Sequence, residues 1–148
     1  MNIALGSDDG GYVLKEHIKA FVQSLGHQTT DTGTFSTEST DYPVFGFRTA
    51  ELVAEGICER GIVFCTTGIG ISIAANKVPG IRAALCSSVS LAQASRKHND
   101  ANVLALGAVS VSEAEAEEIT KIFLEQEFEG GRHERRVSML DSYSEGSS

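Results

Sequence analysis

Basic residues are scarce in this chain, and their scarcity limits what the protein can bind. There are 12 lysines and arginines against 20 aspartates and glutamates, which gives a formal net charge of -8. A protein with a general nucleic-acid role needs a basic face, so we expect no nucleic-acid partner. A phosphate group would need a local cluster of arginines within this acidic whole.

Long apolar runs and paired cysteines are also missing. No stretch approaches the roughly 18 apolar residues of a membrane span, so we expect no membrane partner. The cysteines Cys58, Cys65 and Cys86 are an odd set without metal-ligand spacing. The N-terminal segment soon turns polar, unlike a signal peptide. Free thiols in a reducing cytoplasm are the simplest interpretation.

Three common ligand-binding loops can be excluded around the segment FCTTGIGISIAANK, Phe64 to Lys77. A phosphatase loop needs an arginine six residues after its cysteine, and that position is Ile71. A Walker loop needs Gly-Lys-Ser/Thr, which the chain lacks. The dinucleotide-binding pattern fails at Ile73, where its third glycine should stand.

Short apolar runs alternate with helical patterns along the chain. This alternation predicts one α/β domain over residues 1–148: a doubly wound, Rossmann-like sheet of five parallel strands with helices on both faces. We expect the strand order 2-1-3-4-5, a C-terminal helical tail and a frayed end over about residues 143–148. The expected strands are 2–5, 27–35, 61–65, 82–86 and 102–107, and the expected helices are 11–25, 44–55, 71–76, 88–97, one opened by a Ser112–Glu115 capping box, and 135–142.

The two loops with the most unusual chemistry follow the first and third strands. Open α/β sheets bind ligands at the carboxyl ends of strands, where the strand order reverses, and this places GSDDGG (6–11) beside CTTGIG (65–70). Backbone N–H groups at the next helix start can hold an anion and favour a thiolate at Cys65. Cys65 is therefore either a reactive thiol or a small buried hydrophobe. Asp8 and Asp9 are either acid–base or hydroxyl-binding carboxylates, or plain turn and cap residues.

Polar residues near the end of the chain form a second set of candidates. His98 and Asn99 follow the fourth helix, whose end should face the amino side of the sheet. A catalytic His98 would therefore serve the site of a neighbouring subunit, whereas most surface histidines have no role. Arg132 and Arg136 lie four residues apart, so they either read a phosphate or form a solvated helix start.

With these residues assembled, the chain resembles the ribose-5-phosphate isomerase B family, which includes the galactose-6-phosphate isomerase subunits. The match runs from Asn2 to about Leu140, in the blocks GSDDGG, TDYPVFG, GIVFCTTGIGISIAANKVPGIRAAL, SRKHNDANVLALG and EFEGGRHERRV. The resemblance implies an aldose–ketose isomerase of a small sugar phosphate, without metal or cofactor. It also implies a homo-oligomer, a dimer or tetramer, with active sites shared between subunits.

The resemblance further implies a role for each matched residue. Cys65 would be the base that moves a proton between the first two sugar carbons, with Thr67 in support, and His98 would help to open the sugar ring. The expected substrate contacts are Asp8 and Asn99 to hydroxyls, Arg132 and Arg136 to the phosphate, the amides of Thr66, Thr67, Gly68, Ile69 and Gly70 to the enediolate, and Tyr42 along the site.

Two positions depart from the family pattern. The first loop of the family usually reads Asp-His, and here it reads Asp8-Asp9; many members also carry an arginine shortly after the fifth strand, where this chain has Val109. Both changes disfavour a phosphate, so another pentose or hexose phosphate, or a less phosphorylated sugar, becomes credible. A non-catalytic partner subunit and a small-molecule binding protein are the competing hypotheses.

Overall fold

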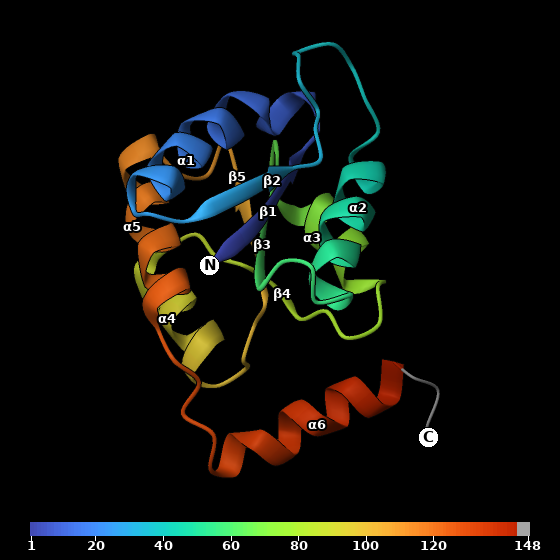
Figure 1. The fold of residues 1–148 in the computed structure, drawn as a ribbon, viewed down its shortest axis with the longest axis vertical. Helices are drawn as coiled ribbons and strands as arrows, with labels where there is room; N and C mark the ends of the chain where they lie inside the picture. The colour runs from blue at the N-terminus through green and yellow to red at the C-terminus, as the bar shows by residue number, and fades with distance from the viewer. Residues whose placement is uncertain (145–148) are drawn as a thin grey trace.

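A computed structural model describes residues 1–144 and contains a five-stranded sheet in which all strands run parallel (Figure 1). The strand order is β2-β1-β3-β5-β4. The strands are β1 (Asn2–Ser7), β2 (Gln28–Asp31), β3 (Arg60–Cys65), β4 (Ala83–Leu85) and β5 (Val103–Gly107). The parallel sheet of five strands, expected from the alternating pattern, is confirmed.

Helices cover both faces of the sheet. On one face α1 and α4 both pack against α5, and on the other face α2 packs against α3. The helices are η1 (Asp9–Gly11, a 3-10 turn), α1 (Tyr12–Ser24), α2 (Tyr42–Ala54), α3 (Ile69–Asn76), α4 (Val89–Lys97), α5 (Glu113–Glu125) and α6 (Arg132–Ser144). The capping box expected at the start of α5 is present, with Ser112 and Glu115 bonded to each other's backbone.

The last two strands are exchanged relative to the expected order 2-1-3-4-5. Every residue of β5 is buried, which suits an inner position, whereas β4 has three residues and leaves Leu85 39% exposed, which suits an edge. The connection from β4 to β5 runs across the sheet in the same direction as the connection from β1 to β2. Because such connections are right-handed, their helices α4 and α1 lie on the same face of the sheet.

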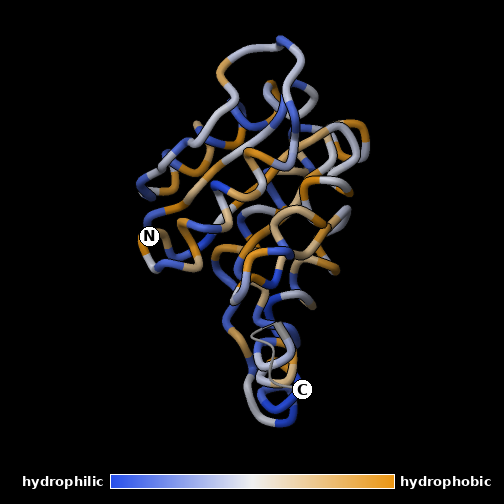
Figure 2. The backbone as a smooth tube through the Cα atoms, turned by 90° about the vertical axis from the view of Figure 1, so that its right-hand side faces the viewer, coloured by the Kyte–Doolittle hydropathy of each residue, from blue (hydrophilic) through white to orange (hydrophobic). Residues whose placement is uncertain are grey.

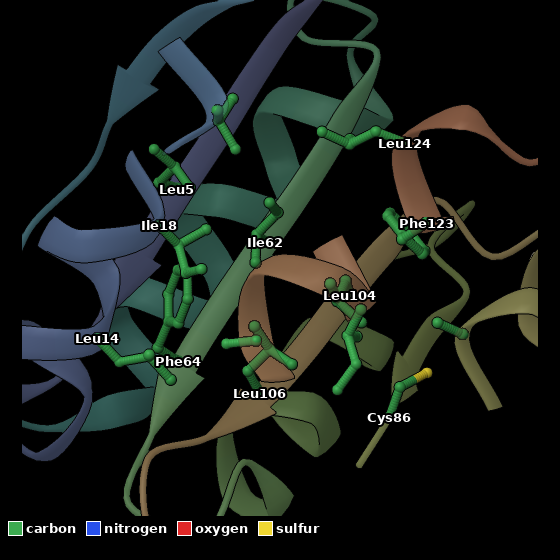
Figure 3. Packing of buried hydrophobic residues seen from close by; sticks show 14 of the residues in the cluster. Leu5, Leu14, Ile18, Ile62, Phe64, Cys86, Leu104, Leu106, Phe123 and Leu124 are labelled. Carbon is green, nitrogen blue, oxygen red and sulfur yellow. The ribbon is translucent and has the colours of Figure 1, made fainter. Parts of the chain in front are cut away.

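Two apolar clusters fill the spaces between the sheet and its helical layers. On the face of α1 and α5, the side chains of Ile62, Phe64 and Leu104 pack with Ile18 and Phe123 (Figure 3). Alternate strand residues pack on the opposite face, and Cys65 belongs to that second cluster. The sheet that carries the candidate loops is therefore rigid and packed from both sides.

The C-terminal helix α6 stands clear of the sheet and of both helical layers (Figure 2). It is tied to the body by the buried Val137 and by an ion pair of 2.8 Å between Arg82 Nη1 and Asp141 Oδ1. The helix spans 132–144, so it is longer than the expected 135–142. The tail is expected from the sequence to fray over about 143–148; positions 143 and 144 are helical, and 145–148 lie outside the described residues. Within 1–144, none of the helices combines the length and hydrophobicity needed to cross a bilayer.

Candidate active site

The loops after β1 and β3 lie against each other at the carboxyl edge of the sheet. The two strands are neighbours, with Ser7 in register with Phe64. The 3-10 turn η1 approaches so closely that a Cβ on Gly10 would collide with the Thr66 side chain. The expected meeting of the segments 6–11 and 65–70 is therefore confirmed.

Cys65 ends β3 and turns its sulfur toward the loop that follows. Its Sγ accepts a hydrogen bond of 3.1 Å from the Gly68 backbone N–H. Gly68 has a φ of +78°, a left-handed conformation that favours glycine, and it is the N-cap of α3. The cysteine is 5% exposed, beside the exposed Thr66 and Thr67. The Cys65 side chain is thus almost fully buried in the second apolar cluster, and its sulfur accepts a hydrogen bond from the amide that begins α3.

The other loop groups have local partners. The Thr67 Oγ1 accepts a bond of 3.2 Å from the Ile69 N–H, so this hydroxyl shapes the start of α3. The ring of Tyr42 lies against Gly70, where a Cβ would come within 2.7 Å of the ring. Tyr42 and Gly70 are thereby brought together with Cys65 and Thr67 on one edge.

The two aspartates after β1 perform different local tasks. Asp8 Oδ1 accepts a bond of 3.0 Å from the Gly11 N–H and caps η1. Its pKa is raised, first by partial burial and also by the charge of Asp9, against the lowering effect of backbone hydrogen bonds. Asp9 Oδ1 accepts a bond of 3.0 Å from the Thr40 N–H. Asp9 therefore ties the loop before α2 to the end of β1, a contact that the sequence did not suggest.

The second set of candidates lies at the opposite edge of the sheet. His98 is the C-cap of α4, and its ring stacks on His133 at 4.5 Å between centroids. The pKa of His133 is lowered, first by desolvation and then by electrostatic repulsion from the neighbouring His98 and Arg132. Arg132 and Arg136 are exposed on α6. Within one copy, these residues and the Cys65 loop are therefore not brought together.

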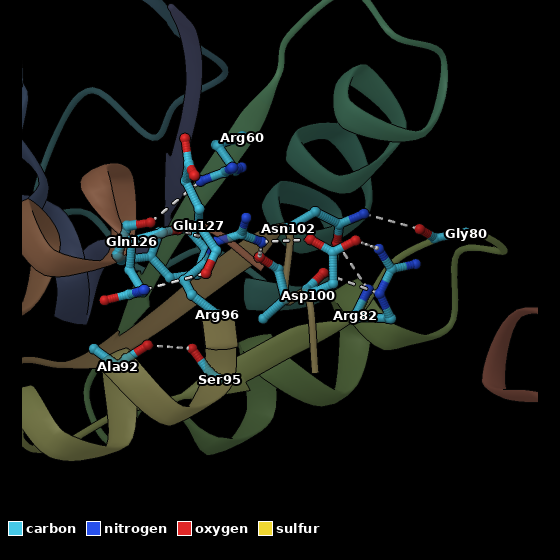
Figure 4. A network of polar contacts seen from close by, with 12 residues as sticks. Arg60, Gly80, Arg82, Ala92, Ser95, Arg96, Asp100, Asn102, Gln126 and Glu127 are labelled. Atoms are coloured by element: carbon cyan, nitrogen blue, oxygen red, sulfur yellow. Dashed lines mark hydrogen bonds and ion pairs between the residues drawn. The ribbon is translucent and has the colours of Figure 1, made fainter. Parts of the chain in front are cut away.

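A buried network holds the turn that follows His98 (Figure 4). Arg96 is buried, and its Nη1 donates to Asp100 Oδ1 at 2.8 Å and to the Ala101 carbonyl at 2.7 Å. Arg82 Nε donates to the Asp100 carbonyl at 3.0 Å. Asn99 lines a cavity of about 410 Å³ beside this turn, between β4 and α6. The only sequence signal for this network is the i, i+4 spacing of Arg96 and Asp100 in the SRKHND block, and this spacing does not distinguish a buried ion pair from a surface one.

Fold and site define a doubly wound α/β protein with a thiol-bearing loop at the switch point of a parallel sheet. The family model for "Ribose/Galactose Isomerase" matches residues 3–140. The chain therefore belongs to the ribose/galactose isomerase family, as the sequence blocks suggested, and it is an enzyme of the aldose–ketose isomerase class.

Individual relatives cover nearly the whole chain. It is 47% identical over 138 residues to the ribose-5-phosphate isomerase B of Escherichia coli, which covers 93% of each chain. It is 40% identical over 144 residues to a D-erythrulose-4-phosphate isomerase of Pectobacterium atrosepticum, at 97% of this chain and 95% of that one. The structure of a Clostridium thermocellum ribose-5-phosphate isomerase B matches with a TM-score of 0.97, 51% identity and full coverage of both chains.

Proposed function

We propose that this protein interconverts an aldose phosphate and its ketose, with ribose 5-phosphate and ribulose 5-phosphate as the first substrate pair to test. The observation that carries the proposal is the Cys65 sulfur bonded to the Gly68 amide at the carboxyl edge of the sheet. The names of the relatives support the substrate class.

In the proposed mechanism the Cys65 thiolate takes the proton from the second carbon of the open-chain aldose. The electron pair forms the carbon–carbon double bond, and the carbonyl oxygen on the first carbon becomes the enediolate oxygen. Loop N–H groups stabilise that charge, a contribution typically of about 3 kcal/mol for each donor. A proton then passes from the hydroxyl on the second carbon to the enediolate oxygen on the first carbon, the thiol returns its own proton to the first carbon, and the oxygen left on the second carbon becomes the new carbonyl. Asp8 holds hydroxyls, and its raised pKa suits a group that shares a proton with them.

We propose that each active site combines the Cys65 loop of one copy with His98, Asn99, Arg132 and Arg136 of another. The support is the location of the two sets at opposite edges of the sheet. A homodimer with two shared sites is the smallest assembly that satisfies this arrangement. His98 would then open the ring, and the two arginines would hold the phosphate.

Mixing inactive variants tests both the mechanism and the sharing. Cys65→Ala and His98→Asn should each abolish isomerisation, and Cys65→Ala should also abolish proton exchange at the second carbon while substrate still binds. Co-refolded in equal amounts, the pair should recover about a quarter of wild-type turnover, because half of the dimers then hold one intact site of two. The matched control is Cys65→Ala with Asp8→Ala, which affect the same half-site and should recover nothing. Equal recovery in both mixtures, or in neither, would contradict shared sites.

The identity of the sugar is a separate question. Asp9 lies at the carboxyl edge, and the exposed Val109 is held there by a bond of 3.0 Å from its N–H to the Thr66 carbonyl. The family positions for a histidine and an arginine thus flank the Cys65 loop and carry no positive charge here. One relative is named for a four-carbon sugar phosphate, so we include erythrulose 4-phosphate in the screen.

The screen compares aldose and ketose phosphates of four to six carbons with the matching free sugars. Arg136→Ala should raise KM much more for a phosphorylated sugar than for its free counterpart, and equal increases would show that Arg136 does not bind phosphate. Turnover by the purified chain alone separates an isomerase from a non-catalytic partner subunit or a binding protein, which predict none.

A further inference from the structure

His98, Glu129 and His133 gather at the amino edge of the sheet although they come from three different segments. His98 caps α4, Glu129 lies in the connection to α6, and His133 is in the first turn of α6. One nitrogen of each imidazole and one carboxylate oxygen all lie within 4.8 Å of one another. Among residues 1–144, this is the group of three side chains whose donor atoms meet closely enough to share one ion.

Backbone contacts hold the three segments in place. The Glu129 N–H donates to the Lys97 carbonyl at 3.1 Å, which fastens the connection to the last turn of α4. The His133 N–H donates to the Gly130 carbonyl at 3.1 Å, and the buried Arg96 donates from Nε to the Gln126 carbonyl at 3.0 Å. The positions of the donors are therefore set by the fold and not by chance meetings of long side chains.

Two imidazoles and one carboxylate are a typical ligand set for a divalent transition metal. With metal–ligand bonds of about 2.0–2.1 Å, the donors of a tetrahedral ion are about 3.4 Å apart. His98 Nε2 and Glu129 Oε1 are already 3.6 Å apart. His98 and Glu129 are exposed, so small side-chain rotations can bring in the third donor. The neighbouring Arg132 opposes a cation, which favours modest and reversible binding over a permanent structural ion.

We propose that His98, Glu129 and His133 bind a divalent transition metal such as Zn²⁺ or Ni²⁺, and that the bound ion inhibits the isomerase by withdrawing His98 from the sugar. The inhibition rests on the proposed function, in which His98 acts at the site of another copy. The metal site itself does not, because binding requires only the three side chains. The ion is an inhibitor in this proposal and takes no part in the proton transfer.

Calorimetric titration of the tag-free chain with Zn²⁺ and with Ni²⁺ tests the site without any turnover. We expect one ion per chain, and a loss of affinity of at least about tenfold in both His133→Gln and Glu129→Gln. His17→Gln is the matched control, because His17 is another surface histidine with two carboxylate partners, Glu113 and Glu117. It should bind the metal as the wild type does. No binding by the wild type, or a loss in His17→Gln but not in His133→Gln, would overturn the site.

Turnover measurements test the inhibition. The wild type should lose most of its activity at saturating Ni²⁺ and regain it when the ion is chelated. His133→Gln should resist the metal: with each protein measured against its own metal-free rate, the fraction of turnover lost at saturating Ni²⁺ should be much smaller in His133→Gln than in the wild type. Equal inhibition of His133→Gln would place the ion elsewhere, for example on the Cys65 thiol, and would overturn the proposal. If calorimetry shows binding but the metal does not change turnover, the inhibition is overturned and the metal site stands. If the protein proves to have no isomerase activity, the proposed function fails, and calorimetry still tests the metal site.

Discussion

The left-handed glycine at the mouth of the Cys65 loop gives a quantitative test of the site. Gly68 has a φ of +78°, and its N–H donates to the Cys65 sulfur. A Cβ added there would lie 2.9 Å from both the Gly107 nitrogen and the Leu106 carbonyl carbon. These are backbone atoms of β5, in the middle of the sheet, so they cannot move aside cheaply. Gly68→Ala should therefore displace the loop and leave the sheet in place.

Two costs add in Gly68→Ala. A left-handed alanine costs about 1 kcal/mol, and overpacking against a rigid neighbour costs about 2 kcal/mol. The free energy of unfolding should fall by about 3 kcal/mol, which is about 1.5 M urea for an m-value near 2 kcal/mol/M. A loop shifted by 1 Å should also lower kcat by about a hundredfold, because the thiolate and the N–H donors lose their alignment. Gly80→Ala is the matched control, since Gly80 has a φ of +86° but no atom within 4 Å of its Cβ position.

The assay compares both variants by urea unfolding at one fixed protein concentration, because oligomerisation contributes to stability. Gly80→Ala should lose about 1 kcal/mol, which isolates the backbone cost, and should keep full kcat. If Gly68→Ala loses no more stability than Gly80→Ala, or keeps its kcat, then the close packing of this loop on β5 does not position the sulfur. That result would refute the reasoning.

Three further variants give testable predictions. Lys15→Met should cost about 2 kcal/mol of unfolding free energy, because the fully buried Nζ lies 2.6 Å from Asp31 Oδ2 and its removal leaves the more exposed Lys19, at 2.9 Å, as the ion-pair partner of that carboxylate; a loss under about 1 kcal/mol in urea would contradict this. Burial alone would raise the pKa of Asp31, but hydrogen bonds from Lys15 and Lys19 outweigh burial and lower this pKa. The stability contributed by the ionised Asp31 is therefore present above its unfolded pKa of about 3.9, and it is lost as the pH falls through the lower pKa of the folded state. Acid unfolding of Lys15→Met should accordingly begin at a higher pH than that of the wild type. Asp9→Asn keeps an acceptor for Thr40 and removes a charge, so it should lower KM several-fold for a sugar phosphate but not for the free sugar; equal changes would argue against a charge effect. Val109→Arg should have the same selective effect on KM, and no effect would place position 109 away from the phosphate.

Local patterns in the sequence identify the strands and the loops but not the neighbours of each strand. The run Val103–Gly107 reads as a buried strand, and it is one. Its place between β3 and β4 depends on which strand better tolerates an exposed edge, a comparison between two distant segments. The observed start of α6, Arg132, lies three residues before the expected start at 135, for a related reason. Its sequence RHERRV offers a single buried apolar residue, Val137, so periodicity cannot locate the first turn.

Part of the candidate site can likewise be predicted from local sequence patterns, and part cannot. The pairing of the Asp8 loop with the Cys65 loop follows from topology, and the structure confirms it through the contact of Gly10 with Thr66. The bond from Thr40 to Asp9 joins residues that are 31 positions apart, and the ion pair of Lys15 with Asp31 joins residues that are 16 positions apart. A lysine in an amphipathic helix is normally read as solvent-facing. Only the folded chain shows that a carboxylate and the rings of Tyr12 and Phe35 surround this one.

The distance between Cys65 and His98 follows from the direction of the chain in a parallel sheet. Every strand delivers its following loop to the carboxyl edge, and every helix returns the chain to the amino edge before the next strand begins. Cys65 ends β3, whereas His98 ends α4, so the two are separated by the length of a strand. Six residues at about 3.3 Å each extend far beyond the reach of a histidine side chain. Both groups can act on one sugar only if the amino edge of a second copy meets the carboxyl edge of the first. The helix that stands clear of the sheet, α6, carries Arg132 and Arg136 and is the element best placed to make that contact.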